Sequence, residues 1–273
     1  MKPILKYPGA KWRLAPWIIE HMPPHIGYLE PFFGSGAVLF NKPPSRVETI
    51  NDLDGAVVRF FKVCREQPDD LARAVALTPW SRQEYLASGF DDAGSLDDVE
   101  FARQFMIRCW MGFGARVGAK TGFRFSSGST PRYGPENPKL WHRLPACIAE
   151  VGTRLLDVQI ENREATEIIE LYDGPDLLIY ADPPYVTGTR TLNGDQYRHE
   201  MTDTDHEQLL TTLNSCKAMV LLSGYDCELY RDMLTGWHLE TTQARAERAA
   251  IRTECLWINP AAMEQGAQIR MEV

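Results

Sequence analysis

The chain has 273 residues, 44% of them hydrophobic, which is enough to bury a sizeable core in one large domain or in one domain that carries an insertion. Its net charge of −8 excludes a surface that binds polyanions over its whole area. No apolar run of about 18 residues or more occurs, and residues 1–8 lack the apolar segment of a signal peptide, so we expect a cytoplasmic protein that does not contact a membrane. The six cysteines are scattered and the six histidines have no metal-binding spacing, which predicts reduced thiols and no metal site.

The first predicted strand, residues 27–30, ends in a glycine turn that leads into a helix start. Gly34 and Gly36 allow the backbone to approach a ligand closely. The next strand, residues 47–50, is followed by Asp52, which lies 18 residues after Gly34. This is near the interval at which nucleotide-binding folds place the acid that binds ribose hydroxyls. Because the full G-x-G-x-x-G pattern is absent, the spacing favours a smaller cofactor that contains adenosine over a dinucleotide.

The middle of the chain is predicted to be helical, but it contains one basic and aromatic stretch. Between Arg103 and Arg143, eight basic residues face one acidic residue, Glu136. Within this stretch, Phe123 and Phe125 alternate between glycines and serines, as in a β-hairpin or a long exposed loop. An acidic protein with one basic segment of this kind is expected to concentrate its anion binding there.

A third predicted strand, residues 177–181, leads into Asp182, Pro183, Pro184 and Tyr185. In open α/β sheets, ligands bind at the carboxyl ends of strands. The two prolines fix the turn and remove two backbone donors, so the turn presents acceptors to its ligand. A carboxylate, a carbonyl and an aromatic ring at this point suit a substrate that offers N–H groups and a flat ring.

The carboxyl-terminal part alternates again between helix and strand. We expect a helix over residues 208–213, started by a capping box at residues 204–207, then a strand at 218–222. Asp203, Asp205 and His206 could hold a metal, but helix capping explains them more simply. Strand and helix alternate at both ends of the chain, which predicts a mostly parallel sheet with helices on both faces, interrupted by an insertion between about residues 60 and 150.

Four segments, taken in order, resemble the Dam-like DNA adenine methylases, which use S-adenosylmethionine. They are Lys6-Tyr7-Pro8-Gly9-Ala10-Lys11, Glu30-Pro31-Phe32-Phe33-Gly34-Ser35-Gly36, Asp182-Pro183-Pro184-Tyr185 and Val220-Leu221-Leu222-Ser223-Gly224-Tyr225-Asp226. The resemblance implies a Rossmann-like methyltransferase sheet formed by residues 1–60 and 150–273. It also implies a mainly helical target-recognition domain, residues 61–149, that contains a β-hairpin or loop.

The resemblance further implies transfer of a methyl group from S-adenosyl-L-methionine to the N6 amine of a flipped adenine in double-stranded DNA. The residues implied in catalysis are Asp182, Pro183, Pro184 and Tyr185. Those implied in cofactor binding are Tyr7, Lys11, Glu30, Pro31, Phe32, Gly34, Gly36, Asp52, Leu53 and Asp182. Those implied in DNA binding are Arg116, Lys120, Arg124 and Arg132. We expect a monomer that needs no metal and lies in the cytoplasm on the nucleoid.

The chemistry of the proposed site agrees with these roles. Asp182 and the carbonyl of Pro183 can accept hydrogen bonds from the two amino hydrogens, and Tyr185 can stack on the extruded base. No Pro-Cys dipeptide occurs, which argues against cytosine-C5 methylation through a covalent adduct.

Several alternatives stay open at this point. The enzyme could methylate the N4 amine of cytosine, since this is another exocyclic amine. The chain could also be a catalytically inactive DNA-binding module with the same fold. Its biological role could lie in restriction-modification, in a mobile element or in a host chromosome. Among single residues, Asp52 could merely cap a helix, Glu30 could pair with Lys11, and Tyr185 could belong to the core.

Overall fold

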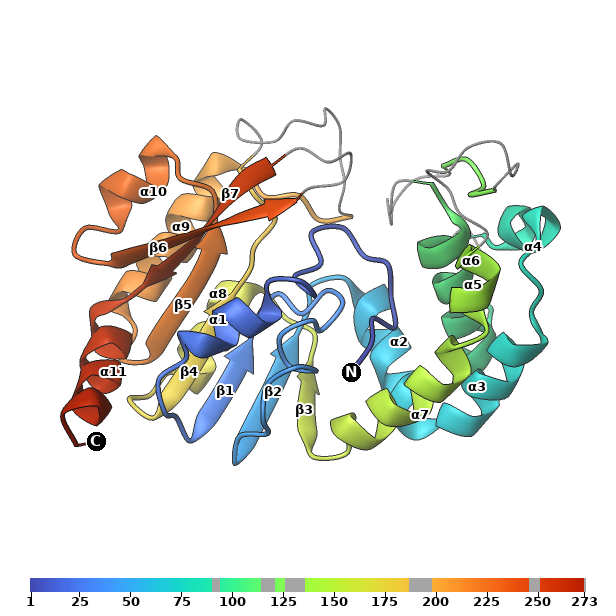
Figure 1. Ribbon diagram of the computed structural model, residues 1–273, viewed down its shortest axis with the longest axis horizontal. Coiled ribbons are helices and arrows are strands. Elements are labelled where there is room, and N and C mark those ends of the chain that lie inside the picture. The colour runs from blue at the N-terminus through green and yellow to red at the C-terminus, as the bar shows by residue number, and fades with distance from the viewer. Residues whose placement is uncertain (90–93, 114–120, 126–135, 187–197, 246–250, 273) are drawn as a thin grey trace. The chain divides into compact units, whose positions relative to one another are not determined.

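The computed structural model describes residues 1–89, 94–113, 121–125, 136–186, 198–245 and 251–272 (Figure 1). The chain divides into two compact units. The sheet unit contains Lys11–Leu53, Val158–Gly194 and His199–Val273. The helical unit contains Met1–Ala10, Asp54–Asp157 and Asp195–Arg198. The proposed division of function between residues 61–149 and the rest of the chain stays a prediction.

The sheet unit is built on a seven-stranded sheet with the order β3-β2-β1-β4-β5-β7-β6 among the described residues. Five neighbouring strands run parallel, whereas β7 is antiparallel to both β5 and β6. The strands are β1 (Gly27–Glu30), β2 (Val47–Asn51), β3 (Val158–Glu161), β4 (Leu177–Ala181), β5 (Met219–Gly224), β6 (His238–Arg245) and β7 (Ile251–Ile258). The predicted α/β fold, a mostly parallel sheet with helices on both faces, is confirmed.

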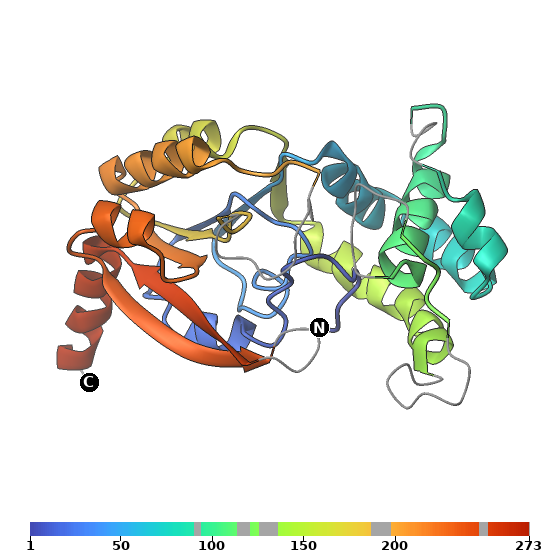
Figure 2. The ribbon, with the colours of Figure 1, turned by 90° about the horizontal axis from the view of Figure 1, so that it is seen from above.

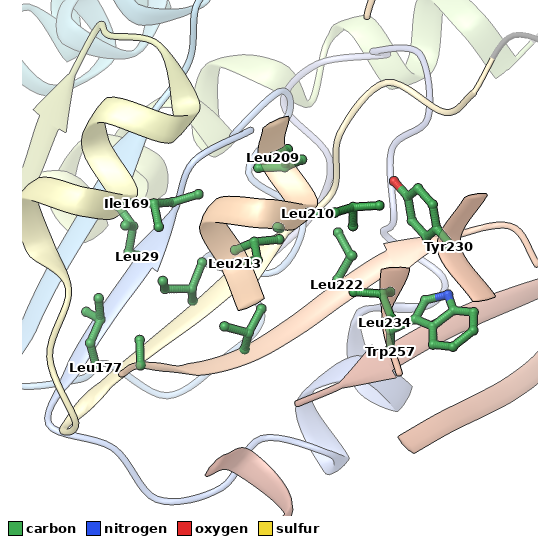
Figure 3. Packing of buried hydrophobic residues seen from close by; sticks show 14 of the residues in the cluster. Leu29, Ile169, Leu177, Leu209, Leu210, Leu213, Leu222, Tyr230, Leu234 and Trp257 are labelled. Carbon is green, nitrogen blue, oxygen red and sulfur yellow. The ribbon is translucent and has the colours of Figure 1, made fainter. Parts of the chain in front are cut away.

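Helices cover the two faces of this sheet, with α8, α9 and α10 on one side and α1 and α11 on the other (Figures 1 and 2). The helices are α1 (Ala15–Glu20), α8 (Ala165–Tyr172), α9 (Asp203–Ser215), α10 (Glu228–Met233) and α11 (Pro260–Glu272). Under α8, α9 and α10, aliphatic side chains of β1, β4 and β5 form a buried cluster, which Leu209, Leu210 and Leu213 of α9 join, with Leu210 beside Leu222 (Figure 3). This core holds the strand ends of the unit in place.

The helix α9 begins with a capping box, although not at the predicted residues. The Thr202 hydroxyl accepts a hydrogen bond from the Asp205 N–H at 3.2 Å, and the Asp205 carboxylate accepts one from the Thr202 N–H at 2.7 Å. The prediction that the box starts at Thr204 was therefore wrong by two residues, because both threonines precede suitable residues at the required spacing. The helix start predicted after Gly36 is a series of turns and not an α-helix.

The helical unit packs α2 and α3 against α5 and α7. Its helices are α2 (Gly55–Glu66), α3 (Pro68–Leu77), α4 (Arg82–Ala87), α5 (Asp98–Met111), α6 (Glu136–Trp141) and α7 (Leu144–Leu155). The aromatic residues of α5, among them Phe105 and Trp110, are buried in the core. Beyond α5, Gly112 and Phe123 form an antiparallel bridge, with the Phe113 N–H donating to the Gly122 carbonyl at 2.7 Å, so the chain returns on itself there.

Candidate active site

The predicted site residues of the sheet unit lie where the strand order reverses. The chain passes from β1 to β2 and β3 on one side, and from β4 to β5 on the other, so β1 and β4 flank the switch point. Glu30 is the last residue of β1, and Asp182 follows the last residue of β4. Parallel neighbours end at the same edge of a sheet, and in open α/β sheets this edge at the switch point is where ligands bind.

The glycine turn after β1 is tied to the end of β2. Gly34 has a φ of 51° and Gly36 a φ of 68°, both in the left-handed region that favours glycine. The Gly34 N–H donates to the Asp52 carboxylate at 2.8 Å. A Cβ at Gly36 would lie 2.5 Å from the Phe33 ring and 2.4 Å from the Phe40 ring, so Gly36 is needed for packing inside the turn. The residue that caps the following helix, Gly55–Glu66, is Asp54 and not Asp52, because the Asp54 side chain accepts a hydrogen bond from the Ala56 N–H.

Asn51, which the sequence analysis did not single out, joins three segments at this edge. Its side-chain amide donates to the Pro31 carbonyl at 2.9 Å and to the Arg163 carbonyl at 3.0 Å, and its side-chain oxygen accepts from the Arg163 N–H. Asn51 is almost fully buried. The sequence does contain a signal for Asn51, since it is a polar residue at the end of a predicted strand and directly precedes Asp52.

The Asp182 carboxylate is partnered by Lys11. The ammonium of Lys11 lies 3.0 Å from Oδ1 of Asp182, and both side chains are largely buried. Burial raises the pKa of Asp182 above its ordinary value, while the charge of Lys11 and hydrogen bonds from Lys11 and Tyr185 oppose this rise. The buried carboxylate is therefore held beside a fixed positive charge. The following Pro183 is buried and Pro184 is half-buried.

Glu30 is buried and bonded to a neighbour on its own strand. The Tyr28 hydroxyl donates to Glu30 Oε2 at 2.9 Å. Burial raises the pKa of Glu30 to about 8, the Tyr28 hydrogen bond opposes this, and the nearby charge of Asp182 adds to it. Lys11 contacts Asp182, and the alternative that Glu30 pairs with Lys11 stays a prediction.

Tyr185 is held from several sides. Its hydroxyl donates to Glu254 Oε2 of β7 at 3.0 Å, and its ring centroid lies 4.5 Å from that of Tyr225 in an edge-to-face arrangement. The Lys11 ammonium lies 4.6 Å from the ring centroid. Burial, followed by the charges of Asp182 and Glu254, raises the pKa of the Tyr185 hydroxyl well above its ordinary value, so the hydroxyl is protonated at neutral pH.

The other predicted cofactor residues occupy varied positions. In the sheet unit Pro31 is buried, Phe32 packs against the hydrophobic cluster under α8 to α10, and the Leu53 side chain is exposed. Tyr7 belongs to the helical unit, where it is nearly buried. Their roles at a cofactor stay predictions.

Of the predicted DNA-binding residues, only Arg124 lies within the described part of the chain; Arg116, Lys120 and Arg132 lie outside it. Arg124 is half-buried, and its backbone N–H donates to the Met111 carbonyl at 2.7 Å.

The basic stretch also contains residues with structural roles. The Arg103 guanidinium bonds Glu100 at 2.6 Å and Glu84 at 2.8 Å, which joins α5 to α4. Arg108 is buried and donates to the Ser88 carbonyl. Part of the positive charge counted in the sequence is therefore used inside the helical unit.

The described residues hold no group of three or more His, Cys, Asp or Glu side chains arranged for a metal ion. Within the same part of the chain, no helix is long and apolar enough to cross a membrane.

A parallel sheet with an acid and a glycine turn at its switch point, followed by Asp-Pro-Pro-Tyr on the next strand, defines the class of Rossmann-like methyltransferases that act on amines. Residues 7–248 match the family model described as D12 class N6 adenine-specific DNA methyltransferase, and the chain belongs to this family. The predicted resemblance and the predicted activity, DNA adenine-N6 methylation, are confirmed. Cytosine-N4 methylation is not supported.

Characterised relatives align over most of their length. The Type II methyltransferase M.MjaIII of Methanocaldococcus jannaschii is 26% identical, over 90% of this chain and 92% of the relative. The Type II methyltransferase M1.LlaDCHI of Lactococcus lactis is also 26% identical, over 92% and 90%. A DNA adenine methylase of Vibrio cholerae is 25% identical, over 88% and 87%. Among solved structures, a putative methyltransferase, yhhF, from Escherichia coli aligns at 12% identity over 92% of this chain and 82% of that chain with a TM-score of 0.35, a weak likeness that adds nothing to the assignment.

Proposed function

We propose that this enzyme uses S-adenosyl-L-methionine to methylate the N6 amine of an adenine that is rotated out of duplex DNA, with Asp182 as the residue that binds the amine. The single observation that carries the proposal is the buried Asp182 carboxylate at the switch point, on the strand next to the glycine turn. Rotation of the base is part of the proposal because the amine cannot be reached inside a duplex.

The residues at the ends of β1 and β2 fit a cofactor that carries a ribose and a positive charge. The left-handed turn at Gly34 would let the backbone approach a ligand closely, and Asp52 directly follows the adjacent strand at the spacing expected for an acid on ribose hydroxyls. The acidic groups of Glu30, Asp52 and Asp182 suit a sulfonium. When bound, S-adenosyl-L-methionine supplies a methyl group on a positively charged sulfur. We also place Lys11, Pro31, Phe32 and Leu53 around it.

In this mechanism Asp182 and the Pro183 carbonyl accept hydrogen bonds from the two amino hydrogens of the adenine. The amine lone pair is delocalised into the base, and these hydrogen bonds draw the nitrogen toward tetrahedral geometry. The ammonium of Lys11, 3.0 Å from Asp182 Oδ1, favours the ionised carboxylate that this role requires. The prolines restrict the turn, so the two acceptors are fixed before the substrate binds.

Tyr185 is proposed to stack on the rotated base. Its ring lies beside the Asp182 carboxylate, with Lys11 in contact with both. Stacking on an aromatic side chain contributes about 1 to 3 kcal/mol per base, which offsets part of the cost of leaving the duplex. This assignment favours a binding role over the alternative that Tyr185 is only a core residue.

Target recognition is assigned to residues 61–149, with Arg116, Lys120, Arg124 and Arg132 as phosphate contacts. The excess of basic residues in this stretch supports the assignment. Two of the relatives are named Type II methyltransferases, which favours a modification enzyme of a restriction system. Since the substrate is DNA, we place the enzyme in the cytoplasm with the nucleoid, as a monomer that needs no metal.

The test is transfer from S-adenosyl-L-methionine labelled at its methyl group to unmethylated bacteriophage DNA, followed by mass spectrometry of the nucleosides. We expect N6-methyladenine from the wild-type protein and from Asp232→Asn, which changes an exposed acid of α10. Asp182→Asn should bind the cofactor and yield almost no product. Label in N4-methylcytosine, or a fully active Asp182→Asn variant, would contradict the proposal.

A further inference from the structure

The strand β7 carries two charged residues whose partners are aromatic rings near the proposed base-binding turn. Glu254 accepts the hydrogen bond of Tyr185, and the Arg252 guanidinium donates to the Tyr225 hydroxyl at 2.9 Å. Residues two apart on a strand point to the same face. Arg252 and Glu254 therefore form one face of β7, opposite the side of Cys255, which belongs to the hydrophobic cluster.

These contacts fix the plane and the rotation of the Tyr185 ring. Tyr225 packs edge-to-face against it at an angle of 68°, an arrangement in which aromatic pairs attract each other. The hydrogen bond to Glu254 restrains the other end of the ring. A tyrosine side chain that is held at its face and at its hydroxyl loses little further freedom when a flat ligand stacks on it.

Two carboxylates compete for the one hydroxyl proton of Tyr185. Asp182 and Glu254 both act on this phenol, and the hydroxyl is protonated, so it can donate to one of them at a time. The hydrogen bond runs to Glu254. This hydrogen bond to Glu254 fixes the direction of the Tyr185 O–H group.

We propose that Glu254 is a positioning residue for methyl transfer: it holds the Tyr185 ring in place for stacking on the target base. This role rests on the proposed function, in which Asp182 binds the amine and Tyr185 the base. Glu254 touches neither substrate and acts through Tyr185.

A kinetic double-mutant cycle tests the role. We compare wild type, Glu254→Ala, Tyr185→Phe and the double variant for kcat and for KM on unmethylated bacteriophage DNA and on S-adenosyl-L-methionine, with rates normalised to bound cofactor. Each single change should lower kcat about tenfold, which corresponds to one charge-assisted hydrogen bond. KM for S-adenosyl-L-methionine should stay unchanged. The double variant should be no slower than the single variants, because both changes remove the same interaction.

Two further variants separate positioning from stability. Glu254→Gln keeps an acceptor for the Tyr185 hydroxyl and should recover most of the lost kcat. Glu240→Ala is the matched control, since Glu240 accepts a hydrogen bond from His238 on the adjacent strand β6, and its kcat should equal that of the wild type. Thermal unfolding of each variant shows whether a loss of rate reflects a loss of folded protein.

The outcomes that overturn the inference are distinct from those that overturn the proposed function. Wild-type kcat in Glu254→Ala, or losses that multiply in the double variant, would overturn the positioning role alone. A folded wild-type protein that transfers no methyl group to DNA would overturn the proposed function and this role with it.

Discussion

In the sheet unit, two acids at the strand ends, Asp182 and Glu30, are largely buried and each is held by a defined partner, whereas in the helical unit the basic residues divide into two groups. Asp182 contacts Lys11, and Glu30 accepts from Tyr28. In the helical unit, Arg103 and Arg108 bond to internal acceptors, while Arg124 contributes its backbone to a β-bridge. Burial and partner, more than the count of charges, therefore determine what each charged residue does.

The strongest test of this comparison is Asp182→Ala. It removes the buried carboxylate that is proposed to bind the amine, so kcat should fall by about a thousandfold or more. Binding of S-adenosyl-L-methionine, measured by calorimetry, should be weakened only in part. Turnover at the wild-type rate would show that the buried acid of the sheet unit has no part in the reaction.

The second test concerns the basic residues that are proposed to contact DNA. Changing Arg116, Lys120 and Arg124 together to alanine should weaken DNA binding about a hundredfold and lower the slope of log affinity against log salt by about three. Alanine at Arg46 and Lys217, two exposed basic residues of the sheet unit, is the control. An unchanged salt slope in the triple variant, measured by fluorescence anisotropy, would remove these residues from the interface.

Arg103→Ala tests the structural group of basic residues. The change leaves Glu84 and Glu100 without their shared guanidinium and should lower the free energy of unfolding by about 2 kcal/mol. Arg65→Ala, which removes a pair with the adjacent Glu66 at the surface, should cost less than about 0.5 kcal/mol. DNA affinity of the folded Arg103→Ala protein should match the wild type; a marked loss would place Arg103 with the DNA-binding group instead.

The last test concerns the pH dependence of stability. The folded pKa of Glu30, about 8, is above its ordinary value of 4.5, so in this range the folded protein binds a proton that the unfolded chain has lost. Stability should fall as the pH rises from about 4.5 to about 8. In Glu30→Gln, the free energy of unfolding measured in urea should fall less steeply with pH. A smaller dependence on pH should remain, because the pKa of Asp182 is also raised. Equal slopes in both proteins would mean that Glu30 ionises freely.

The sequence predicts the parts of the site that depend on local pattern. An apolar run before two prolines identifies β4 and Asp182, and the glycine spacing identifies the turn that bonds Asp52. The contact between Tyr185 and Glu254 joins residues 69 positions apart and depends on the antiparallel pairing of β5 with β7. Local pattern holds no signal for such a pairing.

The patterns of charge and of glycine predict where residues of interest lie, but not which role each residue has. The number of basic residues identifies the basic stretch between Arg103 and Arg143. It does not distinguish Arg103, which is bonded internally, from residues that are available to a ligand. Gly36 was predicted at the cofactor, whereas the close approach of Phe33 and Phe40 gives it a packing role that is independent of any ligand. Both distinctions depend on three-dimensional partners.

The contact of Lys11 with Asp182 has a consequence for the reaction cycle. A side chain of the protein already supplies an N–H donor to this carboxylate, and the same ammonium lies against the Tyr185 ring. In the proposed mechanism, binding of the amine would exchange one donor for another and would not have to create the partner of a buried charge. The carboxylate would keep its counter-ion after the methylated base leaves, so the proposed cycle contains no unpaired buried anion.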